Sequence, residues 1–190
     1  VITMCGIIGR VGSDSLVPYL LKGLECLEYR GYDSAGMTVM GKDGMKTCKC
    51  VGRIMSLRQR ADTVDLSGTL GIGHTRWATH GKPSNENAHP HLSNDGHIAV
   101  VHNGIIENHL EIKAFLEERG FRFLSETDTE VIPNLISFFH EDDLLSAVQK
   151  AVKMLKGSYA LGIISASEPR KLIAVKKDSP LIIGVKDGEK

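Results

Sequence analysis

The sequence predicts one α+β domain built on largely antiparallel sheets. Strand-like apolar runs come first, amphipathic helices follow, and strand-like runs return towards the carboxyl end. A glycine-flanked tetrapeptide at 41–44 separates two of these runs, as the turn of a hairpin does. With 190 residues, the chain is long enough to bury one sizeable core.

In the first half of the chain, strand and helix signals alternate. The tripeptide Gly12-Ser13-Asp14 can cap a helix from about Ser15 to Glu28, whose leucines form one apolar stripe. Residues 54–61 fit a second, short helix, and the polar, glycine-rich stretch 27–36 is expected to form a loop. Strands are expected over residues 4–11, 35–40, 45–51 and 69–75.

The second half begins with a long segment, 76–96, that has neither a helical nor a strand period. Loops of this length are uncommon inside compact domains and are often functional lids. A strand over 97–102 is expected to end in Asn103-Gly104, and Pro133 is tolerable in the first turn of the helix after the capping run 125–130. Further helices are expected over 107–119 and 144–155, and further strands over 159–165, 172–175 and 181–185.

Charge and cysteine content exclude several classes of protein. Lysine plus arginine equals aspartate plus glutamate, 23 of each, so no basic excess indicates a nucleic-acid partner. No apolar run is long enough to span a bilayer, and no signal-peptide pattern precedes Met4. The four cysteines have the spacing of neither a disulfide framework nor a zinc site. We therefore expect a reducing, cytoplasmic location, with no membrane and no nucleic acid as partner.

Cys5 is the first candidate nucleophile, because it follows Met4 and opens a short apolar run. If everything up to Met4 were removed, Cys5 would carry a thiol and a free α-amine on one residue. Such an amine titrates near pH ~8 and could take the thiol proton and later return a proton to a leaving group. The alternative is a small buried side chain at the start of a strand, since free cysteine is among the most buried residue types.

Three downstream stretches carry groups that could serve such a nucleophile, and each has a structural alternative. Arg76 could hold a carboxylate or form a surface ion pair, and Trp77 could exclude water as part of a lid or anchor the core. Asn103 and the Gly104 N–H could form an oxyanion hole or only a turn. Asp128 could bind an ammonium group or cap the following helix.

The histidines raise a metal hypothesis, because seven of the eight lie between His74 and His109. His89 and His91 could place two ligands on one face of an extended segment. No His-Glu-x-x-His or paired Cys-x-x-Cys pattern accompanies them, so satisfied structural histidines are the favoured interpretation. We expect neither a metal nor another cofactor.

Taken together and in order, several motifs resemble the glutaminase domain of class II glutamine amidotransferases, which are N-terminal-nucleophile hydrolases. Among these, the chain is most similar to the glucosamine-6-phosphate synthase family (glutamine–fructose-6-phosphate aminotransferase, isomerizing). The resemblance runs from Met4 to Lys190 and implies a four-layer α-β-β-α sandwich. The matching stretches are Met4–Ile7, Glu28–Gly36, His74–Gly81, Asn87–His91, Val101–Gly104 and Ser125–Glu130.

The resemblance implies a role for each candidate. Cys5 would attack the side-chain amide of L-glutamine, and Asn103 with the Gly104 N–H would stabilise the oxyanion. Arg76 would hold the α-carboxylate of the substrate and Asp128 its α-ammonium group.

The remaining implied roles concern the loop over the substrate and the support of the nucleophile. Thr79, His80 and Gly81 would line that mobile loop, with Trp77 in it. Arg30 would support the end of the chain that carries the nucleophile.

The resemblance also implies a larger enzyme. The family continues into an isomerase region, absent from this sequence, that receives the ammonia, and the full-length enzyme is expected to be a homo-oligomer. Residues 1–3 are expected to be an extension or cloning remnant, and 4–190 a glutaminase domain that stops before the family's domain does. The alternatives are the glutaminase domain of another class II enzyme, such as amidophosphoribosyltransferase, a glutamine-binding fragment without turnover, and a metal hydrolase.

Overall fold

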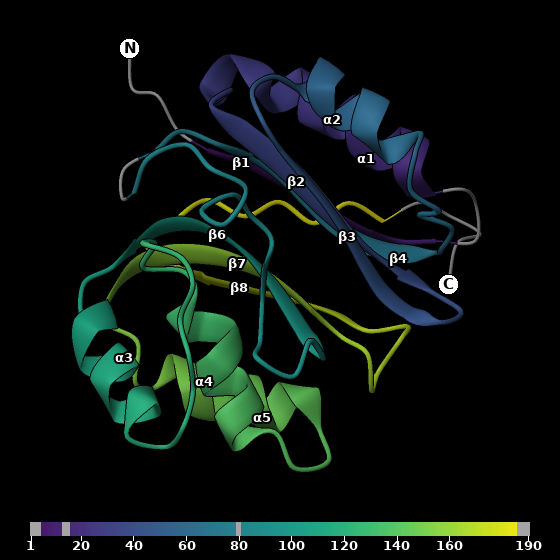
Figure 1. Ribbon diagram of the computed structural model, residues 1–190. Coiled ribbons are helices and arrows are strands. Elements are labelled where there is room, and N and C mark those ends of the chain that lie inside the picture. Colours follow the sequence, from purple (N-terminus) through teal and green to yellow (C-terminus); the bar gives the residue numbers. More distant parts are fainter. Residues whose placement is uncertain (1–4, 13–15, 79–80, 186–190) are drawn as a thin grey trace.

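Two antiparallel sheets pack face to face, and helices cover the outer face of each (Figure 1). The computed structural model describes residues 5–12, 16–78 and 81–185. The first sheet, in the order β1-β4-β2-β3, contains β1 (Gly6–Val11), β2 (Ser34–Gly41), β3 (Gly44–Val51) and β4 (Leu70–Arg76). The second sheet, in the order β5-β6-β7-β8, contains β5 (His91–Leu92), β6 (Ile98–Ile106), β7 (Gly157–Ser165) and β8 (Leu172–Lys177).

The helices form the two outer layers of the sandwich. On the first sheet lie α1 (Leu16–Leu27) and α2 (Ile54–Ala61), and a single 3₁₀ turn, η1 (Glu28–Arg30), follows α1. On the second sheet lie α3 (His109–Glu117), α4 (Val131–Phe139) and α5 (Leu144–Val152). The predicted α-β-β-α arrangement is therefore confirmed. Within the described part of the chain, no helix is long and apolar enough to cross a membrane.

Strand β6 shows how the layers are built from the sequence. Its apolar run is buried on both faces because successive side chains of a strand point to opposite sides. Ile98 and Val100 pack into the core under α3–α5, whereas Ala99 and Val101 pack between the two sheets. In that central layer they meet side chains of the first sheet, among them Ile72. The sheet–sheet core is therefore narrow and made of small and medium side chains.

Several local predictions are confirmed. The tetrapeptide at 41–44 closes the β2–β3 hairpin, with Gly41 opposite Gly44, and the helix predicted over 54–61 is α2. Pro133 is the third residue of α4, where its missing N–H breaks no helical bond. The proposed cap of α1 falls on residues 13–15, which lie outside the described part of the chain.

Two strand predictions need correction. The strand expected over 181–185 is wrong: β8 ends at Lys177, and Ile182 is 94% exposed. Asp178 has a positive φ of 55°, and Pro180 has no backbone donor, so the chain leaves the sheet before reaching this apolar run. The end of β6 is also misplaced, because the strand continues through Asn103 and Gly104 to Ile106.

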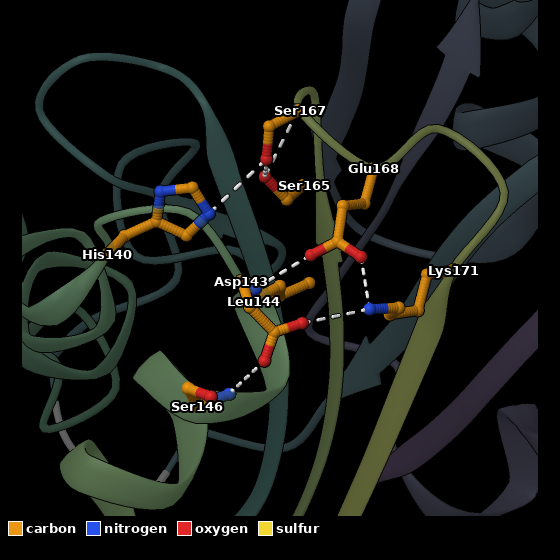
Figure 2. A network of polar contacts seen from close by, with 8 residues as sticks. All are labelled: His140, Asp143, Leu144, Ser146, Ser165, Ser167, Glu168 and Lys171. Atoms are coloured by element: carbon orange, nitrogen blue, oxygen red, sulfur yellow. Dashed lines mark hydrogen bonds and ion pairs between the residues drawn. The ribbon is translucent and has the colours of Figure 1, made fainter.

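A polar network joins the start of α5 to the turn between β7 and β8 (Figure 2). Asp143 caps the helix, with its Oδ2 accepting from the Ser146 backbone N–H at 2.7 Å and its Oδ1 lying 3.2 Å from Lys171 Nζ. Lys171 also pairs with Glu168, whose Oε1 accepts from the Leu144 N–H at 2.7 Å. The hydrogen bonds from Ser146, and then Lys171, lower the pKa of Asp143 to about 2.

Candidate active site

Cys5 and Asn103 meet where the two sheets face each other. Cys5 directly precedes β1, while Asn103 lies in β6 of the opposing sheet. The Asn103 Nδ2 donates to the Cys5 backbone carbonyl at 3.0 Å. Both residues line a cavity of about 870 Å³, together with Arg76, Gly104 and Asp128. The structure therefore brings together five candidates that are scattered along the sequence.

The thiol of Cys5 is held by the backbone of Trp77. The Trp77 N–H donates to Cys5 Sγ at 3.2 Å, and the thiol can donate to the Trp77 carbonyl at 3.6 Å. Burial raises the pKa of Cys5 above its ordinary value, and the nearby Asp33 adds to this. The Trp77 N–H and the positive charge of Arg76 oppose the shift. Because the net effect favours the neutral thiol, a nucleophilic role requires a base.

Arg76 ends β4 and is buried, with only 3% of its surface exposed. Its Nη2 donates to the carbonyl of Gly81 at 3.0 Å, so the guanidinium contacts the segment that follows β4. A surface ion pair, the alternative considered for this arginine, does not fit this burial. A guanidinium on the wall of a cavity suits the bidentate recognition of a carboxylate.

The segment after Arg76 is anchored by a residue that the sequence analysis missed. The Asp33 N–H donates to the Arg76 carbonyl at 3.1 Å, and Asp33 Oδ2 accepts a close hydrogen bond from the Ala78 N–H. Trp77 lies between these two contacts, with its ring edge-on to Tyr32 at 5.6 Å and 36% exposed. Trp77 is therefore not a core anchor, and its exposure suits a lid residue.

Asp128 is buried but does not cap the helix that follows. Its Oδ2 accepts from the Ile106 N–H at 2.8 Å, at the end of β6. The helix α4 begins only at Val131, and its first turn shows no side-chain cap from Glu130. The capping interpretation of Asp128 is therefore wrong, and its carboxylate contributes negative charge to the cavity wall.

Gly104 occupies a backbone conformation that requires glycine. Its φ is +130°, and a Cβ placed there would lie 2.0 Å from the Ser158 carbonyl oxygen of β7. Asn103 and Gly104 therefore do not form a turn, and Gly104 takes a glycine-only position inside a strand. Such positions are common where backbone groups face a ligand.

Of the four remaining predicted site residues, the structure describes two. Arg30, at the end of η1, lines the same cavity. Gly81 accepts the bond from Arg76 and has a φ of +73°. Thr79 and His80 lie outside the described residues.

Four buried histidines lie in this part of the molecule, and two of them, His89 and His102, line the cavity. The side chains of His74, His89, His91 and His102 are at least 95% buried. Across the ranges that the structure describes, no group of three or more His, Cys, Asp or Glu residues has an arrangement that could hold a metal ion. Their crowding between residues 74 and 102 was visible in the sequence, but only the structure shows which polar atoms they contact.

The two-sheet fold brings a cysteine beside a strand of one sheet into contact with an asparagine of the other, an arrangement that fits an amide-hydrolysing enzyme with a cysteine nucleophile. A sequence model of the "Glutamine amidotransferase domain" family matches residues 74–190. The chain therefore belongs to the glutamine amidotransferase domain family.

The chain is also similar to curated proteins of one name within this class. The chain is 52% identical over 184 residues to glutamine–fructose-6-phosphate aminotransferase [isomerizing] of Clostridium acetobutylicum, covering 97% of this chain and 30% of that protein. It is 55% identical over 187 residues to the protein of the same name from Clostridium perfringens, covering 98% and 30%. The chain thus spans somewhat less than a third of the length of these relatives.

A solved structure supports the same class. The glutamine phosphoribosylpyrophosphate amidotransferase of B. subtilis is similar with a TM-score of 0.73 and 30% sequence identity. The match covers 84% of this chain and 35% of that one.

Proposed function

We propose that this chain hydrolyses the side-chain amide of L-glutamine to glutamate and ammonia through a thioester on Cys5, without a cofactor. The observation that carries this proposal is the contact between Cys5 and Asn103 across the two sheets, in a cavity walled by Arg76 and Asp128. A thiol, an amide donor and two opposite charges are the groups that this reaction needs.

The reaction begins when Cys5 Sγ attacks the amide carbon of glutamine and the thiol proton passes to the Cys5 α-amine. A carbon–sulfur bond forms, and the negative oxygen of the tetrahedral intermediate accepts hydrogen bonds from Asn103 Nδ2 and the Gly104 N–H. The intermediate collapses as the carbon–nitrogen bond breaks, and the amine returns the proton to departing ammonia. Water then attacks the thioester with the amine as base, which releases glutamate and restores the thiol.

The charged walls of the cavity determine the substrate class. Arg76 would bind the α-carboxylate of glutamine and Asp128 its α-ammonium group, so the site would select the free amino acid. The segment of Trp77, Thr79, His80 and Gly81 would cover the substrate, and Arg30 would support the end of the chain that carries Cys5.

For the whole protein, we propose that the ammonia serves the synthesis of glucosamine 6-phosphate from fructose 6-phosphate in an isomerase region beyond this chain. The names and the greater length of the curated relatives support this, and their identities of 52% and 55% exceed the 30% to the phosphoribosylpyrophosphate amidotransferase structure. A cytoplasmic, homo-oligomeric full-length enzyme is part of the same proposal.

The test is ammonia release from glutamine by a chain that begins at Cys5, with and without a chelator, and by its Cys5→Ala variant. We expect turnover that is lost in the variant and insensitive to the chelator. Glutamine binding without turnover would favour a binding module, and loss of activity with the chelator would favour a metal hydrolase.

A further inference from the structure

His74 lies in the first sheet and contacts the oxyanion residue of the second sheet. On β4, His74 is paired with Ile7 of β1, two residues after Cys5, and with Gly36 of β2. Its Nε2 lies 2.9 Å from Asn103 Oδ1 and 3.0 Å from the backbone carbonyl of His102. The imidazole of His74 therefore connects β4, which pairs with β1, to Asn103, which contacts Cys5.

The surrounding carbonyls assign the proton on this ring. A backbone carbonyl can only accept a hydrogen bond, so the contact with the His102 oxygen requires a proton on His74 Nε2. The Asn103 atom 2.9 Å from that N–H must then be the acceptor, Oδ1. On the other side, the Cys5 carbonyl also only accepts, which requires Asn103 Nδ2 there. The contacts with His74 and with Cys5 therefore require the same orientation of the Asn103 amide.

The ring of His74 is itself fixed by its neighbours. It lies against the ring of His89, with centroids 4.2 Å apart. His89 Nε2 lies 2.9 Å from Thr129 Oγ1, and the same hydroxyl lies 2.8 Å from His102 Nδ1. His74 has no exposed surface, and burial lowers its pKa to about 3, so the ring is neutral and carries one proton. That proton is already used at Nε2, and among the described residues Nδ1 has no hydrogen-bond partner.

We propose that His74 is a positioning residue for the oxyanion hole: its Nε2–H holds Asn103 Oδ1, so that Asn103 Nδ2 faces Cys5. This rests on the proposed glutaminase function. Without that donor, the hydrogen bond from Asn103 Nδ2 to the Cys5 carbonyl would alone oppose a turn of the amide that presents its oxygen to the developing negative charge. The expected defect therefore lies in the transition state more than in the binding of glutamine.

The first test compares His74→Phe, which keeps a ring but removes the donor, with His74→Gln, which can supply an amide N–H. Loss of one oxyanion donor lowers kcat by about 10²–10³-fold, so mispositioning in the Phe variant should lower it by roughly 10- to 100-fold. KM should stay within about two-fold, and the Gln variant should recover part of kcat. A fall in kcat/KM carried by KM alone would overturn the proposal.

A double-mutant cycle separates positioning from general damage. If His74 acts through Asn103, then His74→Phe should have little further effect on kcat in an Asn103→Ala background. His91→Phe is the matched control, because His91 is equally buried and bonds Thr127 instead. Its effect on kcat should add to that of Asn103→Ala. Full additivity for His74→Phe would overturn the proposal.

A measurement that needs no turnover keeps this inference distinct from the proposed function. Imidazole ¹⁵N spectra, with His74→Phe to assign the signal, should show a neutral Nε2–H ring from about pH 8 down to about pH 5. A proton on Nδ1, or titration within that range, would overturn the proposal. If the parent chain bound glutamine but released no ammonia, the proposed function would fail, and the spectrum would still decide the assignment.

Discussion

At the scale of single residues, the site combines two buried groups of opposite charge with a thiol that burial keeps neutral. Arg76 and Asp128 are both at least 95% buried on the cavity wall. A free amino acid carries a carboxylate and an ammonium group, which complement these two charges. Because the thiol is neutral, its attack on a substrate requires a base. The Cys5 nitrogen can be that base only if it is a free amine.

Replacing Arg76 by alanine should lower kcat/KM for glutamine. Truncating one member of a buried charge pair costs about 2–5 kcal/mol, and this should appear chiefly in kcat/KM. Arg170→Ala, at an exposed arginine between β7 and β8, is the matched control. Steady-state ammonia release measures both variants. An unchanged kcat/KM in Arg76→Ala would show that this arginine does not bind the substrate.

A chain that keeps residues 1–4 should turn glutamine over far more slowly than one that begins at Cys5. With residues attached, the Cys5 nitrogen is an amide whose lone pair is engaged in resonance, so it cannot act as a base. General acid–base help is worth about 10²–10⁴-fold in rate. Ammonia release is compared after intact mass has verified each amino terminus. Equal rates with the extension intact would rule out the amine as the base.

The sequence was sufficient to select Cys5, Arg76, Asn103, Gly104 and Asp128, because the motifs that contain them, taken together and in order, resemble those of a known family. Their roles in turnover stay predictions, but the structure places all of them on one cavity.

The contacts that support these residues could not be predicted from the sequence, because they join segments that are distant along the chain. Asp33 and Ala78 are 45 residues apart, and His74 and Asn103 are 29 apart. No local pattern in a sequence reveals which such atoms will meet.

At the scale of elements, the caps and strand ends explain both the successes and the failures of prediction. Elements were predicted correctly where short-range sequence signals determine the structure, as in the β2–β3 hairpin. The strand predicted over 181–185 is absent because an apolar run cannot show whether the edge of a sheet is available for pairing. The strand end predicted at Asn103-Gly104 was wrong because the same dipeptide can form a turn or a glycine-only position inside a strand.

The cap of α5 gives a prediction on pH. The pKa of Asp143 is lowered from 3.8 to about 2 in the folded chain, so its charge stabilises the fold above about pH 4. This contribution is lost as the pH falls through the folded pKa. Asp143→Asn keeps an oxygen that can cap the helix but removes the charge. Its melting temperature should therefore be lower than that of the parent at about pH 7, with the two converging towards about pH 2. A difference that stays constant over this range would contradict the assignment.

At the scale of the whole molecule, the central layer between the sheets determines how the two halves of the site face each other. Ile72 of the first sheet is fully buried there, against side chains of β6 and β7. Cys5, which directly precedes β1, and Asn103, in β6, belong to opposite sheets, so this layer also determines how far apart these two residues lie.

Ile72→Ala should lower the free energy of unfolding by about 2–5 kcal/mol, because it leaves a cavity in a closely packed layer. Ile182→Ala is the control, since that side chain is 94% exposed and its loss should change stability by no more than about 0.5 kcal/mol. Denaturant melts measure both. Equal stabilities for the two variants would mean that the sheets are not held together by this layer.

The order of the strands along the chain makes the domain divisible. Strands β1–β4 all precede β5–β8, so a break at the exposed pair Asn85-Glu86 would leave one complete sheet on each fragment. One fragment would carry Cys5 and Arg76, and the other would carry Asn103, Gly104 and Asp128, so the residues proposed for catalysis and for substrate binding would be divided between the two. Ammonia would then be released only when the two fragments met, at a rate set by the product of their concentrations. The pair would work as a split enzyme whose output reports the proximity of whatever each fragment is fused to.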